Sequence, residues 1–384
     1  MKFVWSGMLR RLTSKCCLAT LLEPRGGRAA SADLGALMRA PRAGLRPARP
    51  PWGSRKLGTA RRFLVRLGQA LALCLPLALA AQPSVLKPAL NPALNPALIP
   101  VEVTPGVWMV QGAAALGSPA NRNFISNAAF VVTPGGVLVI DALGSPALAR
   151  ELVAAIGRIT PQPIRHVVVT HYHADHIYGL QVFKDIGATI IAHHAGQAYL
   201  HSDTAALRLQ ASREELAPWI DDQTHLVAAD RWIEGPETLS LGGVDFVLQP
   251  AGPAHTLEDL VVLMPSTGVL FAGDLVFRGR IPFVGQADSG RWIEALDRLL
   301  VHKPSIIVPG HGPVSRSAAT DLQLTRDYLL HLRRTMGEAA QQLEPFEEAY
   351  ARADWSRFEQ LPLFRAANRI NAYNTYLFME HAGR

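Results

Sequence analysis

Residues 170–181 read THYHADHIYGLQ and place three histidines and one aspartate within the six positions 171–176. The whole chain contains 13 histidines in 384 residues, so this density is far above its average. The preceding run IRHVVVT is rich in β-branched residues and predicts a buried strand that ends at Thr170. The cluster therefore falls at the carboxyl end of a strand, where α/β enzymes commonly place their functional sites.

The spacing within the cluster favours metal binding. His171 and His173 stand two residues apart, so both are expected to project to the same side of an extended segment and meet one ion. Asp175 and His176 begin the next predicted helix and are offset toward a second ion. Imidazoles and a carboxylate suit Zn²⁺, and the lack of nearby thiolates leaves iron or manganese open.

Three further ligand-type residues stand beside strand-like runs later in the chain. His255 lies in AGPAHTLED, Asp274 ends the predicted strand VLFAGD, and His311 follows SIIV in VPGHGPV. Glycine and proline around these residues allow the backbone to turn sharply and to approach an ion closely. Each residue alone could be an ordinary loop residue, but together they complete the coordination of two metal ions.

These motifs resemble the metallo-β-lactamase superfamily, whose signature H-x-H-x-D-H matches residues 171–176. The resemblance covers roughly residues 101–315 and implies an α/β fold, a four-layer αββα sandwich, here with a C-terminal helical extension over 316–384. It implies two Zn²⁺ ions, with iron or manganese as alternatives. The implied ligands are His171, His173 and His255 for metal 1; Asp175, His176 and His311 for metal 2; and Asp274 as the bridge.

The resemblance also implies a reaction. A hydroxide bridging the two metals would cleave a thioester, ester, lactone or amide of a small molecule, with Asp175 also orienting the nucleophile. The FAGD ending is closer to the glyoxalase II and lactonase pattern than to the cysteine-containing lactamases. The stretches FRGRIPFVGQADS and NAYNTYLFMEH resemble an exported SoxH-like branch associated with sulfur oxidation and with quinoprotein-dependent systems.

Two alternative functions remain open. A β-lactamase is one, because one lactamase subclass has a site without cysteine. A mononuclear iron persulfide dioxygenase is the other, because that branch carries the same histidine cluster. His311 argues against the dioxygenase, since one metal does not need a ligand for a second site.

Residues outside the ligand set are assigned more weakly. Asn123, Arg278 and Arg280 are candidate substrate-binding residues, and structural salt bridges are an equally good explanation for the two arginines. Asp141 ends the predicted strand VLVID, where it would either hydrogen-bond a ligand histidine or cap the strand.

The positive charge of the chain belongs to its first 80 residues. They hold 15 Lys and Arg against two acidic residues, a net +13, whereas the remaining 304 residues hold 23 against 29, a net −6. This distribution excludes nucleic acid as a partner of the folded domain and leaves a small-molecule substrate. All three cysteines, Cys16, Cys17 and Cys74, also lie in this leader, so the domain that follows has none.

The leader has the parts of a secretory signal. Residues 61–81 combine three arginines, an apolar run over 67–79 and a small-residue exit with cleavage near Ala81. The apolar run is too short for a stable membrane span, and we expect a periplasmic or secreted protein. A signal this far from Met1 suggests that translation starts near Val65. The repeat KPALNPALNPALIP makes residues 82–100 a proline-rich linker. The sequence leaves the oligomeric state open.

Overall fold

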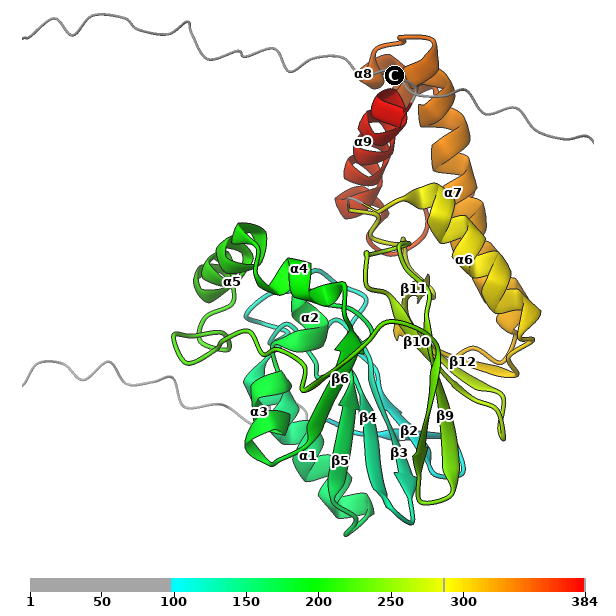
Figure 1. Ribbon diagram of the computed structural model, residues 1–384. Helices are drawn as coiled ribbons and strands as arrows, with labels where there is room; N and C mark the ends of the chain where they lie inside the picture. The colour runs from blue at the N-terminus through cyan, green and yellow to red at the C-terminus, as the bar shows by residue number, and fades with distance from the viewer. Residues whose placement is uncertain (1–97, 286, 383–384) are drawn as a thin grey trace, which may run out of the picture. The chain divides into compact units, whose positions relative to one another are not determined.

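The computed structural model describes residues 98–285 and 287–382 (Figure 1). The predicted leader, its signal segment and the linker up to residue 97 lie outside the described residues. A search of the described residues finds no helix whose length and hydropathy would let it cross a bilayer.

In this described part, the first sheet has seven strands that follow one another in chain order from β1 to β7. The pairs from β1 to β4 are antiparallel, and those from β4 to β7 are parallel. The carboxyl ends of β4, β5, β6 and β7 therefore meet at one edge of the sheet. The strands are β1 (Val101–Thr104), β2 (Val107–Val110), β3 (Ala128–Thr133), β4 (Gly136–Ile140), β5 (Ile164–Val168), β6 (Thr189–His193) and β7 (Arg231–Ile233).

The second sheet of the described chain has five strands in the order β12-β11-β10-β9-β8. Its pairs are antiparallel except β11 with β12, which run parallel. The strands are β8 (Glu237–Leu241), β9 (Val244–Pro250), β10 (Leu260–Met264), β11 (Val269–Phe277) and β12 (Ile306–His311).

Four layers follow from how the two sheets bury their faces. One core lies between the sheets, where Ile140 and Val168 of the first sheet join Phe246 and Phe271 of the second. A further core joins the outer face of each sheet to helices. Figure 1 shows these helices on the outer side of each sheet. The αββα sandwich expected from the sequence is confirmed.

The helices begin where side chains can satisfy their first amide groups. Ser145 accepts a hydrogen bond from Leu148 N before Pro146 opens α1, and Asp288 does the same for Gly290 and Arg291 in α6. The helices are α1 (Pro146–Ile159), α2 (Ala174–Ile177), α3 (Leu180–Asp185), α4 (Gly196–Leu200), α5 (Asp203–Glu215), α6 (Ser289–Val301), α7 (Ala318–Gln341), α8 (Phe346–Arg352) and α9 (Phe364–Ala382).

The structure differs from the sequence-based prediction at a few elements. Residues 194–217 have a continuous helical pattern in the sequence, but the structure forms two helices there, because Ser202 accepts a bond from Ala205 N and starts α5 anew. Asp274 does not end its strand, since β11 continues to Phe277 past an irregular register at Gly273, whose φ is +50°. The structure also contains the short strands β1, β7 and β8, of four, three and five residues, which the sequence-based prediction did not include.

The C-terminal helical region predicted from the sequence is present and is continuous with the second sheet's outer core. α7 packs on α6, on β11 and on α9, which runs beside it (Figure 1). Buried residues from Trp292 in α6 through Leu329 in α7 to Ala372 in α9 belong to one apolar cluster. The last helix is therefore held against the layer that carries β11.

Substitution of Phe246 by alanine tests the core between the sheets. Phe246 is fully buried there, so we expect Phe246→Ala to lower the free energy of unfolding by about 3–5 kcal/mol. Urea denaturation followed by circular dichroism measures the change. Leu207→Ala, at a position 70% exposed on α5, is the control and should change it by less than about 0.5 kcal/mol. Equal effects of the two variants would contradict this assignment of the core.

Candidate metal centre

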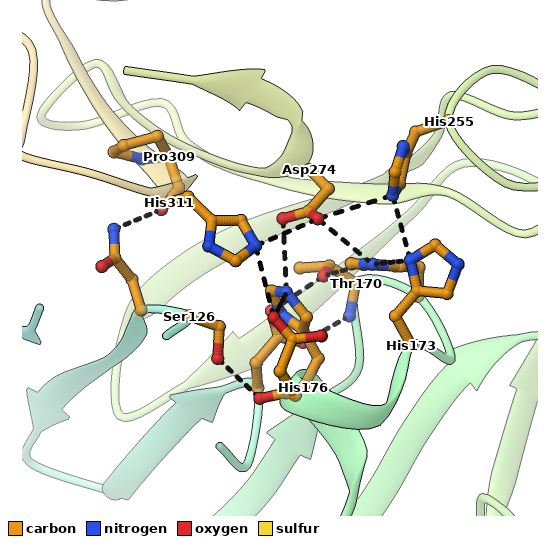
Figure 2. Close-up of polar contacts among 12 residues, drawn as sticks. Ser126, Thr170, His173, His176, His255, Asp274, Pro309 and His311 are labelled. Atoms are coloured by element: carbon orange, nitrogen blue, oxygen red, sulfur yellow. Dashed lines mark hydrogen bonds and ion pairs between the residues drawn. The ribbon is translucent and has the colours of Figure 1, made fainter. Parts of the chain in front are cut away.

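The structure brings the predicted ligands together at one edge of the sandwich (Figure 2). Among the described residues, two groups of His and Asp side chains have ligand atoms within 4.8 Å of one another. They come from the β5–α2 loop, from α2 itself, from the β9–β10 loop, and from β11 and β12. The groups are His171, His173, His255 and Asp274, and Asp175, His176 and His311.

The first group has the spacing of ligands around a single ion. His173 Nδ1 lies 3.1 Å from His171 Nε2 and 3.0 Å from His255 Nε2. Asp274 Oδ2 lies 3.7 Å and 3.4 Å from the same two Nε2 atoms. Ligands bound tetrahedrally to zinc at about 2.0–2.1 Å stand roughly 3.3 Å apart, so this donor set fits zinc.

The second group shares Asp274 with the first. Asp175 Oδ2 is 3.6 Å from His176 Nε2 and 3.3 Å from His311 Nε2. Asp274 approaches both histidines, with Oδ1 3.2 Å from His176 Nε2 and Oδ2 3.2 Å from His311 Nε2. Figure 2 shows the Asp274 carboxylate between the histidines of the two groups. This is the position that a bridging ligand requires.

Asp141 determines which nitrogen of two ligand histidines carries the proton. Its Oδ2 lies 2.8 Å from both His176 Nδ1 and Thr170 Oγ1, and its Oδ1 accepts Thr170 N at 2.8 Å. A carboxylate accepts, so the hydroxyl and His176 Nδ1–H both donate to it. Thr170 Oγ1 then accepts from His171 Nδ1 at 3.0 Å. Both histidines are left with an Nε2 lone pair that faces Asp274.

His311 and His255 are positioned by residues that contact the ring edges or faces pointing away from the cluster. His311 Nδ1 donates to the carbonyl of Ile125 at 2.7 Å, which leaves its Nε2 free, and its ring stacks on Phe277 with centroids 4.9 Å apart. The His255 ring meets Trp292 at 4.9 Å. Asn127 donates to the carbonyls of Pro309 and Gly312, both at 2.8 Å, and so fixes the turn that carries His311.

The charges of the buried cluster favour a cation. Burial lowers the pKa of His171 and His173, and it lowers the pKa of His255 to about 3. Burial also opposes charge on Asp274, but His311, His176 and His171 hold the pKa of that carboxyl well below its usual range. The site thus keeps an ionised carboxylate among mostly neutral imidazoles.

The electrostatic surroundings of His176 also favour a positive charge at the site. Burial would lower its pKa, but the carboxylates of Asp274, Asp175 and Asp141 raise the pKa well above the usual value. In the tautomer that Asp141 favours, His176 Nε2 and Asp274 Oδ1 present lone pairs to each other at 3.2 Å, and within the described residues neither buried atom has a hydrogen-bond partner. A divalent metal satisfies both atoms, so the residues fit the metal that the ligand pattern implies.

Two glycines, Gly310 near the end of β12 and Gly312 just after it, permit the close approach of this segment to β11. A Cβ on Gly310 would lie 2.0 Å from Asp274 Oδ1, and one on Gly312 would lie 1.9 Å from the carbonyl oxygen of Arg278. Gly312 also has a φ of +91°, which disfavours other residues. The glycines on either side of His311 therefore avoid clashes that any larger residue would make at these positions.

The three candidate substrate-binding residues occupy different environments. Arg278 Nε pairs with Asp321 at 2.7 Å and its Nη1 donates to Val314 O, so it links β11 to α7. Asn123 is buried and donates to the carbonyl of Gly144. Arg280 is 5% exposed, and in the described chain no carboxylate lies within 4.0 Å of its guanidinium, which instead sits 3.2 Å from His311 Nδ1.

Several supporting residues carried no signal in the sequence. Thr170 and Asn127 act through contacts with residues that are distant in the chain or in another sheet, and Trp292 supports His255 from α6. Glu258, which is 6% exposed, accepts a bond from Tyr172 N at 3.1 Å and so steadies the turn between His171 and His173. Its place three residues after His255 is a weak hint, recognisable only once both loops are seen together.

The chain is similar to proteins of known family. The family model described as "Metallo-beta-lactamase superfamily" matches residues 121–311. The chain is 28% identical over 194 residues to "Metallo-beta-lactamase type 2" of Bacillus sp. (strain 170), covering 49% of this chain and 67% of that protein. It is 23% identical over 239 residues to "Linear primary-alkylsulfatase" of Pseudomonas sp. (strain ATCC 19151), covering 53% of this chain and 45% of that protein.

A solved structure extends the likeness in fold. The stereoselective inverting sec-alkylsulfatase Pisa1 from Pseudomonas sp. aligns with a TM-score of 0.56 at 17% identity, over 73% of this chain and 50% of that one. The family model and the relatives together support membership of the metallo-β-lactamase superfamily. The chain is accordingly a metal-dependent hydrolase with a set of candidate metal-binding residues.

Replacement of Asp141 by asparagine tests the support of His176 and Thr170. The amide keeps the shape but cannot accept from both donors, so we expect Asp141→Asn to lower zinc affinity about 10–100-fold. Competition with a chromophoric chelator measures the affinity. Asp245→Asn, an exposed carboxylate outside the site, is the control. An unchanged affinity in Asp141→Asn would show that this carboxylate only caps its strand.

Substitution of Gly310 tests the close approach of the two strands. Gly310→Ala places a methyl group against Asp274 and should lower zinc affinity at least about tenfold. The matched control is Gly157→Ala on α1, where a Cβ meets no atom within 4 Å. The control should keep its zinc affinity and gain about 0.5–1 kcal/mol in stability from helix propensity. Equal zinc affinity in the two variants would rule out the steric argument.

Proposed function

We propose that this chain is an exported, dinuclear zinc-dependent hydrolase that cleaves an acyl bond of a small molecule. The observation that carries the proposal is the position of Asp274, which contacts histidines of both ligand groups. Three imidazoles beside it suit one zinc ion, and two imidazoles with Asp175 suit the other. Iron or manganese would fit the same nitrogen and oxygen ligands less specifically.

The chain's own residues hold and orient the components of the reaction. Divalent metals bound at this site would polarise a carbonyl group and lower the pKa of a bound water to about 7. Asp175 lies on α2 and is half-buried. Its Oδ2 faces His176 and His311, which leaves Oδ1 to orient that water. Ser126 does not orient the water itself. Its hydroxyl donates to the backbone carbonyl of Asp175 and so fixes the segment that presents the Asp175 carboxylate.

Arg280 adds a positive charge beside the second group. Its guanidinium lies over Phe277, 5.5 Å from the ring centre, and next to His311. Burial lowers the pKa of Arg280, and the carboxylates of Asp274 and Asp175 oppose that effect only in part. We infer that Arg280 helps to retain negative charge that develops on the substrate during acyl cleavage.

The branch and the location of the protein are inferred from resemblance. The glyoxalase II-like aspartate bridge and the SoxH-like stretches support an acyl compound outside the cytosol as the substrate. The signal-like segment over 61–81 supports periplasmic or secreted location. Export makes a cytosolic glutathione thioester a less accessible substrate.

Competing functions are distinguished by metal content and substrate. The relatives include proteins named as β-lactamases and an alkylsulfatase, so β-lactams and alkyl sulfate esters are the alternative substrates to test. A persulfide dioxygenase would need one iron ion and oxygen, whereas the described residues offer candidate ligands for two ions. The second group is therefore the feature that favours a dinuclear hydrolase.

Metal removal and reconstitution provide the first experiment. We expect the purified protein to contain two zinc ions per chain by plasma emission, and chelation to lower hydrolysis by at least about 100-fold. Two equivalents of Zn²⁺ should restore it. The assays use p-nitrophenyl butyrate, a thioester, a lactone, nitrocefin and dodecyl sulfate. One iron ion per chain with oxygen uptake on a persulfide would overturn the proposal, and nitrocefin or dodecyl sulfate turnover alone would replace the substrate class.

Ligand substitution provides the second experiment. Asp175→Asn and His255→Ala should each reduce kcat/KM by at least about 100-fold, because each removes a metal ligand, while circular dichroism shows an unchanged fold. His225→Ala and Asp222→Asn, both exposed, serve as matched controls. Wild-type turnover in both ligand variants would remove the proposed mechanism.

A further inference from the structure

A cavity of about 960 Å³ opens beside the first ligand group. His173 and His255 of the first ligand group line it, and so do Asn374 and Phe378 of α9. Its volume is at the upper end of the range of about 300–1,000 Å³ that small-molecule sites occupy. A substrate bound at the metal centre would extend from the two histidines toward the C-terminal helix.

The wall of this cavity is mostly apolar. Tyr199 of α4, Leu257, Phe283 and Phe378 contribute large side chains, and Leu257 and Phe283 are 62% and 44% exposed. Large exposed apolar side chains gathered at one opening indicate a binding surface and are unusual elsewhere on a protein.

The charged groups of the cavity are already paired. Glu258 accepts the amide of Tyr172. Asp288 caps α6 and lies 3.6 Å from the guanidinium of Arg291. The cavity therefore presents no unpaired cation, among the residues described, that would bind an anionic substrate group.

The 282–285 segment of the wall is fastened to α9 by Asn371. This asparagine is fully buried; its Oδ1 accepts Val284 N at 2.9 Å and its Nδ2 donates to Pro282 O at 2.7 Å. The same Nδ2 lies 3.0 Å from the hydroxyl of Tyr328 on α7. One turn further along, Asn374 donates to Gly285 O at 2.8 Å.

These contacts join two stretches that the sequence had singled out only by resemblance. FRGRIPFVGQADS follows the strand of Asp274, and NAYNTYLFMEH lies in α9, almost 90 residues later. A side-chain amide that satisfies both a backbone donor and a backbone acceptor holds a loop firmly, because losing it would leave both groups buried and unpaired. The C-terminal helix therefore determines the position of the pocket wall.

We propose that this cavity binds an uncharged, apolar acyl group of the substrate, and that Asn371 and Asn374 are positioning residues that fix its 282–285 wall. The proposal rests on the proposed acyl hydrolysis and names the substrate class for it. The acyl carbonyl would lie at His173 and His255, and the apolar group would lie between Tyr199, Phe283 and Phe378.

The chain offers a closely matched control for Asn371. Asn368 lies one turn earlier on α9, is also fully buried, and also bonds Tyr328, whose hydroxyl donates to its Oδ1 at 2.8 Å. Its Nδ2 donates to the hydroxyl of Tyr350, and none of these contacts reaches the cavity wall. Asn368→Ala thus removes similar bonds from the same helix without releasing the loop.

The experiment compares p-nitrophenyl acetate with p-nitrophenyl 4-phenylbutyrate. In Asn371→Ala, KM for the phenylbutyrate ester should rise about tenfold, while its kcat, KM for the acetate and zinc content stay within about twofold. Phe378→Ala, which leaves the loop bonds intact, should give the same selective rise, and it tests the cavity if Asn371→Ala fails to fold. Asn368→Ala should leave the ratio of the two KM values unchanged.

Binding of 4-phenylbutyrate, the acid that hydrolysis would release, separates this proposal from the proposed function. Calorimetry on the zinc-loaded full chain should show binding that weakens about tenfold in Asn371→Ala and Phe378→Ala but not in Asn368→Ala. If wild-type protein hydrolyses neither ester yet shows this pattern, the hydrolase assignment fails and the cavity assignment stands. Equal KM ratios or equal affinities in Phe378→Ala and wild type would overturn the cavity assignment.

Discussion

The buried carboxylate of Asp141 is the interaction on which the metal centre depends. It receives the amide and hydroxyl of Thr170 and the ring N–H of His176, and through Thr170 it orients His171. Two rings from different parts of the histidine motif are thereby turned so that their Nε2 lone pairs face Asp274. Without a fixed tautomer, these nitrogens could present a proton where a lone pair is needed.

A second constraint is that both sheets must deliver their loops to one edge. β4 and β5 are parallel neighbours in the first sheet, and β11 and β12 are parallel neighbours in the second, so their functional ends lie together. The two halves are joined across the sandwich by Asn127, which donates to the carbonyls of Pro309 and Gly312 on either side of His311. Gly310 lets that turn reach Asp274 without a clash. Sheet pairing thus accounts for ligands spread over 141 positions, from 171 to 311.

Most of the fold and the ligand set could be predicted from the sequence, because buried strands and ligand spacing are local patterns. The histidine motif, His255, Asp274 and His311 all stand next to recognisable strands, and the structure brings them together. Supporting roles could not be predicted in the same way. Asn127 and Asn371 are examples. Asn127 holds the segment around His311 and Asn371 holds the segment at Val284, and only the distant backbone groups that they contact distinguish the two roles. Arg278 and Arg280 likewise differ in their partners, although only Gly279 lies between them.

The link between α9 and the cavity wall has a consequence for how the protein is made. During synthesis the chain emerges from its N-terminus, and all seven ligand residues have been added once His311 is in place. Asn371 and Asn374 are added some 60 residues later, and only then can the 282–285 segment take its final position. A nascent chain therefore contains all of the proposed metal ligands before it contains the residues that position the pocket wall. The residues proposed for catalysis thus precede, in the order of synthesis, the residues proposed to set substrate preference.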